Sequence, residues 1–304
     1  MLITGSSGLI GSALVGALGA REIEVEGFDL RAVGAARGDV CDAERLRGSV
    51  LRCDGVVHLA AVSRVVHAER DPELCRRTNV EGVRNVLDAV SDSPRRPWLV
   101  FASSREVHGQ PDSLPVKEDF PLRPVNVYGQ SKVEGERLIE EARRAGVRAC
   151  TVRLSNVFGA VADHADRVIP AFVRRAMQGE PLLVEGADHT FDFTHTDDVA
   201  RGLVLLTERL IEGAPAPEPI QLTAGEPTTL GDLAAMVVQL SGSSSPIRHA
   251  APRAFDVTRF VGDPSRAAAV LGWRPRVSLR EGLVRLVRDV RRAGVETQLQ
   301  ETPS

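Results

Sequence analysis

The stretch "TGSSGLIG", residues 4–11, lies between a short apolar run and a segment with helical spacing. Gly5 permits a tight turn, Gly8 lets the backbone approach a pyrophosphate, and Gly11 lets a helix pack closely on a strand. The free N–H groups at the start of that helix favour a phosphate. The spacing is GxxGxxG, which by itself also fits a glycine-rich turn. Its place after the first apolar run predicts a dinucleotide-binding loop made of Gly5, Gly8, Leu9, Ile10 and Gly11.

Short apolar runs alternate with helical patterns through the first half of the chain. Runs rich in Val, Ile and Leu, nearly continuous rather than alternating, predict strands at 1–4, 23–28, 55–60, 98–103 and 148–154. Helical periodicity predicts helices at 8–20, 42–51, 73–90 and 126–146. This alternation predicts an α/β fold, a Rossmann doubly wound parallel sheet with right-handed crossovers.

The regular alternation of predicted strands and helices ends after about residue 156. We expect residues 1–156 to form the cofactor-binding Rossmann domain and residues 157–292 to form a smaller C-terminal α/β lobe that binds substrate. Segments near 188–212 are candidates to pack back onto the first domain. The tail at 293–304 is polar and is expected to fray.

Composition excludes several classes of function. The chain has 304 residues, a net charge of -3 and 4% aromatic residues, which argues against nucleic acid as a partner. Its four cysteines are widely spaced, so neither a disulfide framework nor a metal site is expected. No apolar stretch reaches the length of a membrane span, and the first residues leave no room for a leader. We therefore expect a cytoplasmic protein without a membrane partner.

Polar residues after the expected second strand bear on the cofactor. Asp29 can accept both ribose hydroxyls of an adenosine and repels a 2′-phosphate, which favours NAD over NADP. Arg31 leaves NADP open, because a nearby arginine can bind that phosphate. In "GDV", Asp39 is placed against the adenine amino group and Val40 against the ring face. Asp39 is also a candidate helix N-cap, a role that does not exclude the contact with adenine.

The segment "NVYGQSK", residues 126–132, contains the single tyrosine of the chain and one of its two lysines. Tyr128 and Lys132 are four residues apart, so a helix places them on one face. A free phenol has a pKa near 10, and lowering it by about three units requires roughly 4 kcal/mol. A lysine ammonium and a positive nicotinamide are able to supply that, which makes Tyr128 a candidate general base toward an alcohol. The alternative is an exposed tyrosine beside a solvated lysine.

Six motifs in order resemble the extended short-chain dehydrogenase/reductases: "TGSSGLIG", "DGVVHLAA", "RTNVEGVRNVLDA", "FASSREVHG", "NVYGQSK" and "RLSNVFG". Within that family the chain is similar to the NAD-dependent nucleotide-sugar epimerase/dehydratase branch, and is UDP-glucose 4-epimerase-like. The resemblance runs from residue 2 to about residue 283. It implies a Rossmann domain, a smaller C-terminal lobe, bound NAD and commonly a homodimer through a four-helix bundle.

The resemblance also implies roles for single residues. Tyr128 is similar to the catalytic base of the family, Lys132 to its modulator, and Ser104 to the residue that hydrogen-bonds the reacting hydroxyl. Asn79 resembles a buried asparagine that structures the cofactor site. Backbone of Leu59, Ala60 and Ala61 is implied to line the cofactor. Asn79 as a helix cap and Ser104 as a turn residue remain alternatives.

"SSREVHG", residues 103–109, bears on the reaction that follows oxidation. Glu106 matches a glutamate of the dehydratase and decarboxylase members, where typical 4-epimerases have a small or neutral residue. Arg105 departs from the dehydratase pattern. It is a candidate to pair with Glu106 or with a substrate carboxylate, or else to point to solvent.

Phosphate recognition also departs from the family pattern. Phe191 stands where family members often have an arginine that binds the diphosphate. Arg253 and Arg259 are the remaining candidates to bind phosphates, with Asn156 as a further donor.

These features favour an NAD-dependent nucleotide-sugar 4-epimerase, with a UDP-hexose as the expected substrate. A 4,6-dehydratase or decarboxylase that uses Glu106 is the main alternative. A net NAD-dependent reductase or dehydrogenase and an inactive NAD-sensing protein are further ones.

Overall fold

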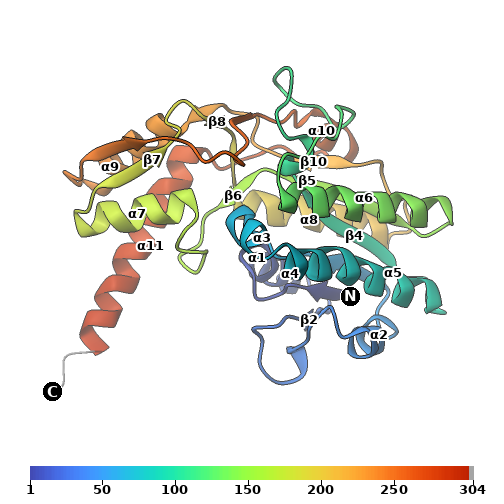
Figure 1. The fold of residues 1–304 in the computed structure, drawn as a ribbon. Coiled ribbons are helices and arrows are strands. Elements are labelled where there is room, and N and C mark those ends of the chain that lie inside the picture. Colours follow the sequence, from blue (N-terminus) through green and yellow to red (C-terminus); the bar gives the residue numbers. More distant parts are fainter. Residues whose placement is uncertain (301–304) are drawn as a thin grey trace.

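The computed structural model describes the backbone of residues 1–300 and the side chains of residues 1–293. Within them the chain forms a large α/β part and a smaller lobe beside it (Figure 1). The large sheet consists of β1 (Leu2–Thr4), β2 (Glu26–Phe28), β3 (Gly55–His58), β4 (Trp98–Ser104), β5 (Ala149–Leu154) and β10 (Ile220–Leu222). Its order is β10-β5-β4-β3-β1-β2, and all pairs are parallel. The predicted doubly wound sheet is thus confirmed.

Burial explains why the strands read as continuous apolar runs. Every residue of β3 and β4 is buried, because helices cover both faces of the sheet. The second strand is shorter than expected: the N–H of Ile23 donates to Leu18 at the end of the first helix (3.2 Å), so pairing with β1 begins only at Glu26.

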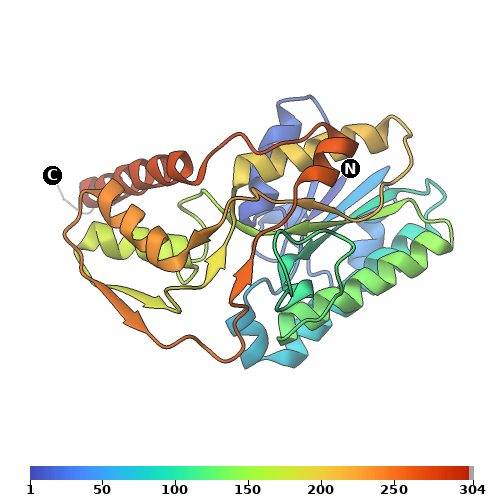
Figure 2. The ribbon, with the colours of Figure 1, turned by 90° about the horizontal axis from the view of Figure 1, so that it is seen from above.

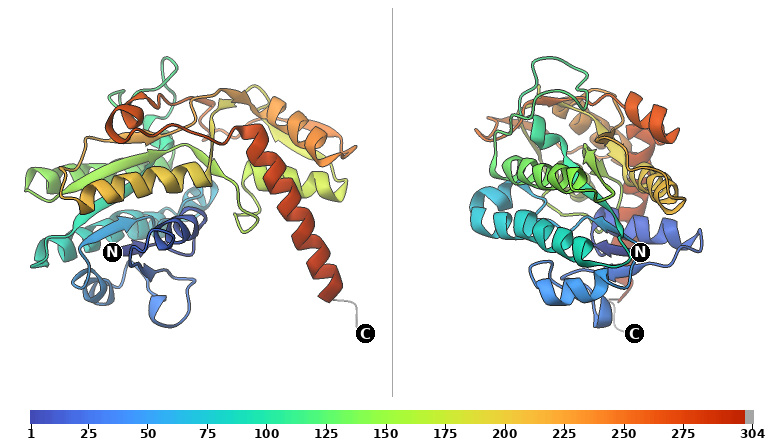
Figure 3. Two further views of the ribbon diagram at one scale, coloured as in Figure 1. Left: turned by 180° about the vertical axis from the view of Figure 1, so that it is seen from behind. Right: turned by 90° about the vertical axis from the view of Figure 1, so that its right-hand side faces the viewer.

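Two layers of helices cover the sheet. On one face α1 (Leu9–Gly19) packs against α8 (Thr196–Ile211), which runs along the sheet in the left view of Figure 3. The opposite face carries α2 (Ala43–Val50), α5 (Gly82–Asp92) and α6 (Val127–Arg144). Each layer encloses its own apolar cluster. The elements between these helices are η1 (Gly34–Ala36), α3 (Val65–Arg70), α4 (Pro72–Arg76), η2 (Arg77–Glu81) and η3 (Arg105–His108).

Strand order determines where a ligand can bind. β2 follows β1 on one side, and β3 lies on the other side of β1, so the chain reverses direction across the sheet between them. In sheets of this kind ligands bind beyond the carboxyl ends of the strands at that reversal. The loops after β1 and β3 are therefore expected to form a cofactor cleft.

The chain returns to the large part after residue 156. α8 lies within the segment near 188–212 that was expected to pack back, and it contacts α1. The return extends further than expected, because β10 pairs with β5 and α10 (Ser265–Leu271) packs on α8 and β10.

Three helices and several short strands form the small lobe, which Figure 2 shows beside the large sheet. The helices are α7 (Val168–Gln178), α9 (Leu230–Ser241) and α11 (Leu279–Gln300). The strands are β6 (Asn156–Phe158), β7 (Leu182–Glu185), β8 (Thr190–Phe191), β9 (Phe193–His195), β11 (Thr228–Thr229), β12 (Ile247–Ala250) and β13 (Arg259–Phe260). A third apolar cluster, which includes Phe172 and Phe260, binds the lobe together.

α11 corrects the expected fraying of the tail. The helix continues through Ala293 to Gln300, and residues 301–304 lie outside the described residues. Across the part of the chain that the structure describes, no helix combines the length and the apolar character needed to cross a membrane. Cys53, Cys75 and Cys150 are buried free thiols, and Cys41 is a partly buried one.

Candidate active site

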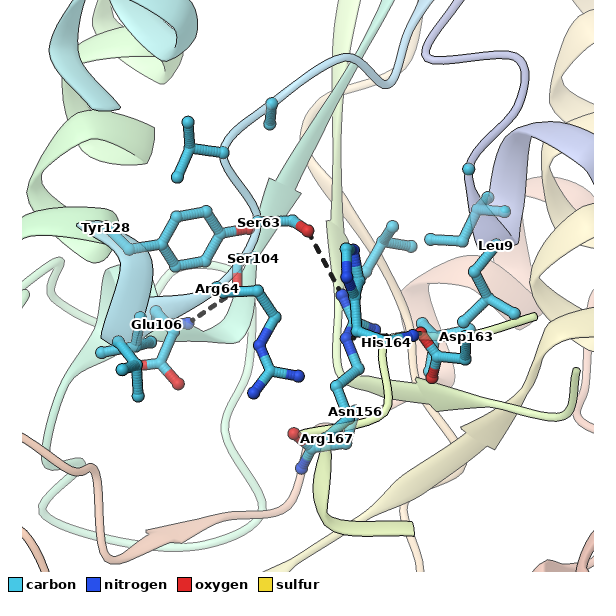
Figure 4. Close-up of a pocket in the computed structure, with 18 of the residues that line it drawn as sticks. Leu9, Ser63, Arg64, Ser104, Glu106, Tyr128, Asn156, Asp163, His164 and Arg167 are labelled. Atoms are coloured by element: carbon cyan, nitrogen blue, oxygen red, sulfur yellow. Dashed lines mark hydrogen bonds and ion pairs between the residues drawn. The ribbon is translucent and has the colours of Figure 1, made fainter. Parts of the chain in front are cut away.

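A cleft of about 800 Å³ lies at the carboxyl ends of β1, β3 and β4. Tyr128, Ser104 and Glu106 lie on one side of it, and Leu9 and Asp163 lie on the other (Figure 4). Its volume is in the range of small-molecule and cofactor sites.

The glycine loop leaves no room for side chains. Gly5 has a φ of +72°, and a Cβ there would lie 2.7 Å from the backbone nitrogen of Ala60. A Cβ on Gly11 would lie 2.1 Å from the carbonyl oxygen of Gly5. No side chain caps α1 at Gly8, and its first turn carries no acidic residue. The start of α1 therefore offers a pyrophosphate a close backbone approach and a positive helix end.

Asp29 is fixed at the end of β2 on the cleft wall. Its Oδ2 accepts the Ser7 N–H (3.0 Å), and its Oδ1 accepts the Arg31 N–H (2.7 Å). The Arg31 guanidinium turns back, with Nε 3.9 Å from Asp29 and a hydrogen bond to the Ser7 carbonyl. Asp29 thus offsets the positive charge of Arg31, the residue that left NADP open as an alternative cofactor.

Asp39 and Val40 also line the cleft, as predicted for the adenine end. Asp39 accepts the N–H of Cys41 (2.9 Å). The alternative of an N-cap at Asp39 is wrong, because Asp42 caps α2 by accepting the Arg45 N–H.

The loop after β3 contributes Leu59, Ala60 and Ala61 to the cleft. Asn79 does not line it, and its assignment to direct cofactor binding stays a prediction. The Asn79 amide accepts the N–H of Val62 (2.8 Å) and donates to the Val62 carbonyl (3.1 Å) and to Ser131 (2.9 Å). It sits in the π-helical turn η2 between α4 and α5 rather than at a helix end. Asn79 therefore positions the loop and is not a helix cap.

Tyr128 and Lys132 both lie on the buried face of α6. Asn126 caps this helix by accepting the Gly129 N–H (2.8 Å), which fixes where its turns begin. Tyr128 is 8% exposed and Lys132 is 3% exposed, so the alternative of a solvated pair is wrong. The Lys132 ammonium donates to the Ala102 carbonyl (2.9 Å) and lies 5.9 Å from the centroid of the Tyr128 ring. Ser104 hydrogen-bonds the phenol from the end of β4.

Burial shifts the pKa of each residue in the direction that favours its neutral form. It raises the pKa of Tyr128 to about 12, against the hydrogen bond from Ser104 and the positive charge of Arg167. It lowers the pKa of Lys132 to about 8. The expectation that Lys132 pulls the phenol below its ordinary pKa is therefore not met by the protein groups alone. A positively charged nicotinamide remains as the source of that shift.

Lys132→Met is expected to change how stability depends on pH. Below about pH 8 folding buries a charged lysine, and between about pH 8 and 10.4 the folded protein releases that proton first. The unfolded chain then binds more protons, so wild-type stability rises with pH in this window. The stability of the variant relative to wild type should fall by up to about 3 kcal/mol across it.

Urea unfolding of both nucleotide-free proteins at about pH 7 and about pH 10 measures this difference. The other titrating groups contribute equally to the pH dependence of stability in the two proteins, so their contributions cancel in the comparison. An equal difference at both pH values would show that Lys132 is not buried as described.

Glu106 and Arg105 form a buried cluster next to Ser104. One Glu106 oxygen lies 2.8 Å from the Arg105 NH2 group, and the other accepts the side-chain N–H of Asn126 (2.7 Å). Arg105 also donates from Nε to Asn156 Oδ1 (3.3 Å). Its guanidinium lies 4.5 Å from the centroid of the Phe191 ring. Arg105 thus pairs with Glu106 and does not point to solvent.

The other residues predicted to bind substrate do not all lie at the cleft. Asn156 lines the cleft, but its amide N–H already donates to the Asp192 carbonyl (3.2 Å). Arg253 lines the cleft and is partly exposed. Arg259 donates to the carbonyls of Pro111 and Asp112 and does not line the cleft, and its assignment to phosphate binding stays a prediction.

Sequence reasoning missed one wall of the cleft. The connection between β6 and α7 carries Asp166 and Arg167, which contact the loop after β3. Arg64 pairs with Asp166 (2.8 Å), and Arg167 donates to Ser63 (3.4 Å), the contact drawn as a dashed line in Figure 4. The polar run "DHADR" at 163–167 is the sequence signal that marked this segment. Among the described side chains, no group of His, Cys, Asp and Glu is arranged to hold a metal ion.

A Rossmann cleft with a glycine loop, a carboxylate at the end of the second strand and a Ser–Tyr–Lys set is typical of dinucleotide-dependent enzymes that oxidise or reduce an alcohol carbon. The model of the NAD dependent epimerase/dehydratase family matches residues 1–219, and the chain belongs to this family.

Individual relatives carry out different reactions. The chain is 28% identical to a UDP-glucose 4-epimerase of Streptococcus mutans, over 91% of this chain and 92% of that protein. It is 30% identical to UDP-glucuronic acid decarboxylase 1 of Arabidopsis thaliana, over 96% of this chain and 69% of that protein. The structure of MoeE5 in complex with UDP-glucuronic acid and NAD superposes with a TM-score of 0.87, at 28% identity over 96% of this chain and 99% of that one.

The cofactor of this family is NAD, in agreement with the prediction from Asp29. The residues present fit it, because the loop at Gly5 and Gly11 has no room for a Cβ and the start of α1 is uncapped. The reaction subtype is not decided by the relatives.

Proposed function

We propose that the protein is an NAD-dependent 4-epimerase of a UDP-linked six-carbon sugar. The observation that carries this proposal is the engagement of both Glu106 oxygens, one by Arg105 and one by Asn126. Relatives that act on UDP-sugars support the substrate class.

Each catalytic group has a separate task. NAD, when bound, would supply the redox chemistry as the acceptor and donor of the hydride at C4 of the sugar. Tyr128 takes the proton of the C4 hydroxyl, and Ser104, which interacts with the phenol, orients that hydroxyl. Lys132 holds its ammonium between the Ala102 carbonyl and the tyrosine ring. Once the 4-keto sugar has turned its other face to the cofactor and C4 has been re-reduced, Tyr128 returns the proton to the C4 oxygen, which completes an epimerisation with no net redox change.

Glu106 decides between this reaction and its main alternative. In a dehydratase a carboxylate must remove the C5 proton of the 4-keto sugar, and that needs a free, basic oxygen. Here an ion pair with Arg105 engages one carboxylate oxygen and an amide hydrogen bond from Asn126 engages the other, so neither oxygen is free to approach C5. Glu106 is therefore assigned to positioning Arg105 and Asn126. Its presence in the cleft and the decarboxylase relative favour the dehydratase or decarboxylase as the second candidate.

Glu106→Gln is expected to retain epimerase activity within about tenfold, because glutamine keeps the volume and an acceptor for Asn126. The variant and wild type are incubated with UDP-glucose or UDP-glucuronate and NAD, and the products are identified by NMR. Wild type should yield the C4 epimer with all sugar carbons retained. A 4-keto-6-deoxy sugar or a pentose with CO2, formed by wild type and lost in Glu106→Gln, would establish the second candidate instead.

The cytoplasmic location and the homodimer stay predictions. α5 and α6 pack against each other on one face of the sheet. Ion pairs join Glu134 of α6 to Arg84 of α5 and to Arg76 of the neighbouring α4. A dimer through this face would therefore be more polar than an apolar helix bundle.

A further inference from the structure

We propose that Arg105 is a specificity-determining residue that binds a carboxylate at C5 of the sugar, so that the substrate is a UDP-hexuronate. This inference rests on the proposed function and deepens it. It concerns binding, and it can be tested separately from the reaction that follows.

The guanidinium of Arg105 is held on three sides. Glu106 contacts NH2, Asn156 contacts Nε, and the ring of Phe191 lies against its face. The side chain is 12% exposed, and its NH1 group is buried without a hydrogen-bond partner. An unpaired N–H of a charged group is costly to bury, and a ligand acceptor would relieve that cost. Arg105 lines the cleft, so a substrate there is the acceptor within reach.

Position indicates which part of the substrate meets Arg105. It follows Ser104 directly, and Ser104 hydrogen-bonds the catalytic phenol. The dinucleotide loop at Gly5 and Gly11 lies after a different strand, β1. Arg105 therefore lies beside the reacting sugar carbon. An oxygen of the group attached to C5, the carbon next to the reacting one, is then closer to Arg105 than the cofactor phosphates are.

Charge decides in favour of a carboxylate over a hydroxymethyl group. A planar guanidinium forms stronger, charge-assisted bonds to a carboxylate than to a neutral hydroxyl. Glu106 contacts only the NH2 group of Arg105. Asn126 donates to the second oxygen of Glu106, which reduces the repulsion between Glu106 and a substrate carboxylate. One arginine can thus serve both anions through different nitrogens.

Binding to the NAD-loaded protein tests the inference. Dissociation constants of UDP-glucuronate, UDP-glucose and UDP are measured by calorimetry in the Tyr128→Phe background, where turnover is suppressed. We expect UDP-glucuronate to bind at least about tenfold more tightly than UDP-glucose. Arg105→Gln should weaken UDP-glucuronate by about 10- to 100-fold and change UDP-glucose and UDP by less than about threefold. Arg123→Gln, at an exposed ion pair away from the cleft, should leave all three unchanged.

Two results would overturn the inference. An equal loss of all three ligands in Arg105→Gln would place Arg105 at the diphosphate or assign it only to holding Glu106. No preference for the uronate in the parent protein would exclude a carboxylate-binding role.

Glu106→Gln provides a second test with the opposite sign, which also covers the case of poor folding of Arg105→Gln. Removing the competing charge should tighten UDP-glucuronate, and weakening of it would assign Arg105 to a structural pair with Glu106. Equal affinity for UDP-glucuronate and UDP-glucose, together with formation of the C4 epimer, would reject this inference and leave the proposed 4-epimerase standing. A preserved uronate preference with loss of water or CO2 would reject the 4-epimerase alone.

Discussion

Tyr128→Phe is expected to lower the turnover of a UDP-sugar by about 10²- to 10⁴-fold, the usual contribution of a general acid–base group. The variant removes one oxygen and leaves the buried ring, which packs with Ala68 and Cys75. Stability and NAD content should therefore change little. Ser104 loses its phenol partner, but its side chain still accepts the Glu106 N–H (3.2 Å).

Initial rates of C4 epimer formation by NMR measure this effect, with NAD content determined after denaturation. Cys150→Ala, a change at a buried thiol within β5, provides a control for general effects of core substitution. Activity of Tyr128→Phe within tenfold of wild type would remove Tyr128 from the proton-transfer step.

Gly11→Ala is expected to abolish tight NAD binding and to destabilise the protein by about 1–3 kcal/mol or more. The added Cβ would lie 2.1 Å from the carbonyl oxygen of Gly5, and this backbone contact can be relieved only by moving the loop away from α1. A Cβ added at Gly16, in the same helix, would have no heavy atom within 4 Å. Gly16→Ala should therefore stabilise the helix by about 0.5–1 kcal/mol.

Thermal unfolding and NAD titration of the two variants measure these opposite signs. The pair is matched, since both change a glycine of α1 to alanine. Similar NAD affinity in Gly11→Ala and Gly16→Ala would show that the close approach between α1 and the loop does not form the cofactor site.

The local parts of the site could be predicted from sequence. The glycine loop, Asp29 and the Tyr128–Lys132 spacing each depend on a few neighbouring residues with a fixed geometry, and the structure places all of them at one cleft. Periodicity and strand order follow from the same kind of pattern, which explains why the Rossmann sheet was predicted.

The remaining features depend on contacts between distant segments. The pair of Glu106 with Asn126 and the contact of Arg105 with Phe191 join distant parts of the chain, and no local pattern encodes them. The π-helical turn at Asn79 interrupts an expected continuous helix because its side chain bonds the loop at Val62. Burial also determines the pKa of Tyr128 and Lys132, and spacing on a helix does not reveal how deep the face lies.

The reaction run in D2O tests the central claim most directly, namely that chemistry stays at C4. An unlabelled UDP-sugar distinguishes transfer within the enzyme, which keeps protium at C4, from exchange with solvent at C5, which introduces deuterium there. We expect the C4 epimer to retain its C4 protium and to gain no deuterium at C5, because Glu106 is held by Arg105 and Asn126. Deuterium at C5, or a product that has lost water or CO2, would contradict the account.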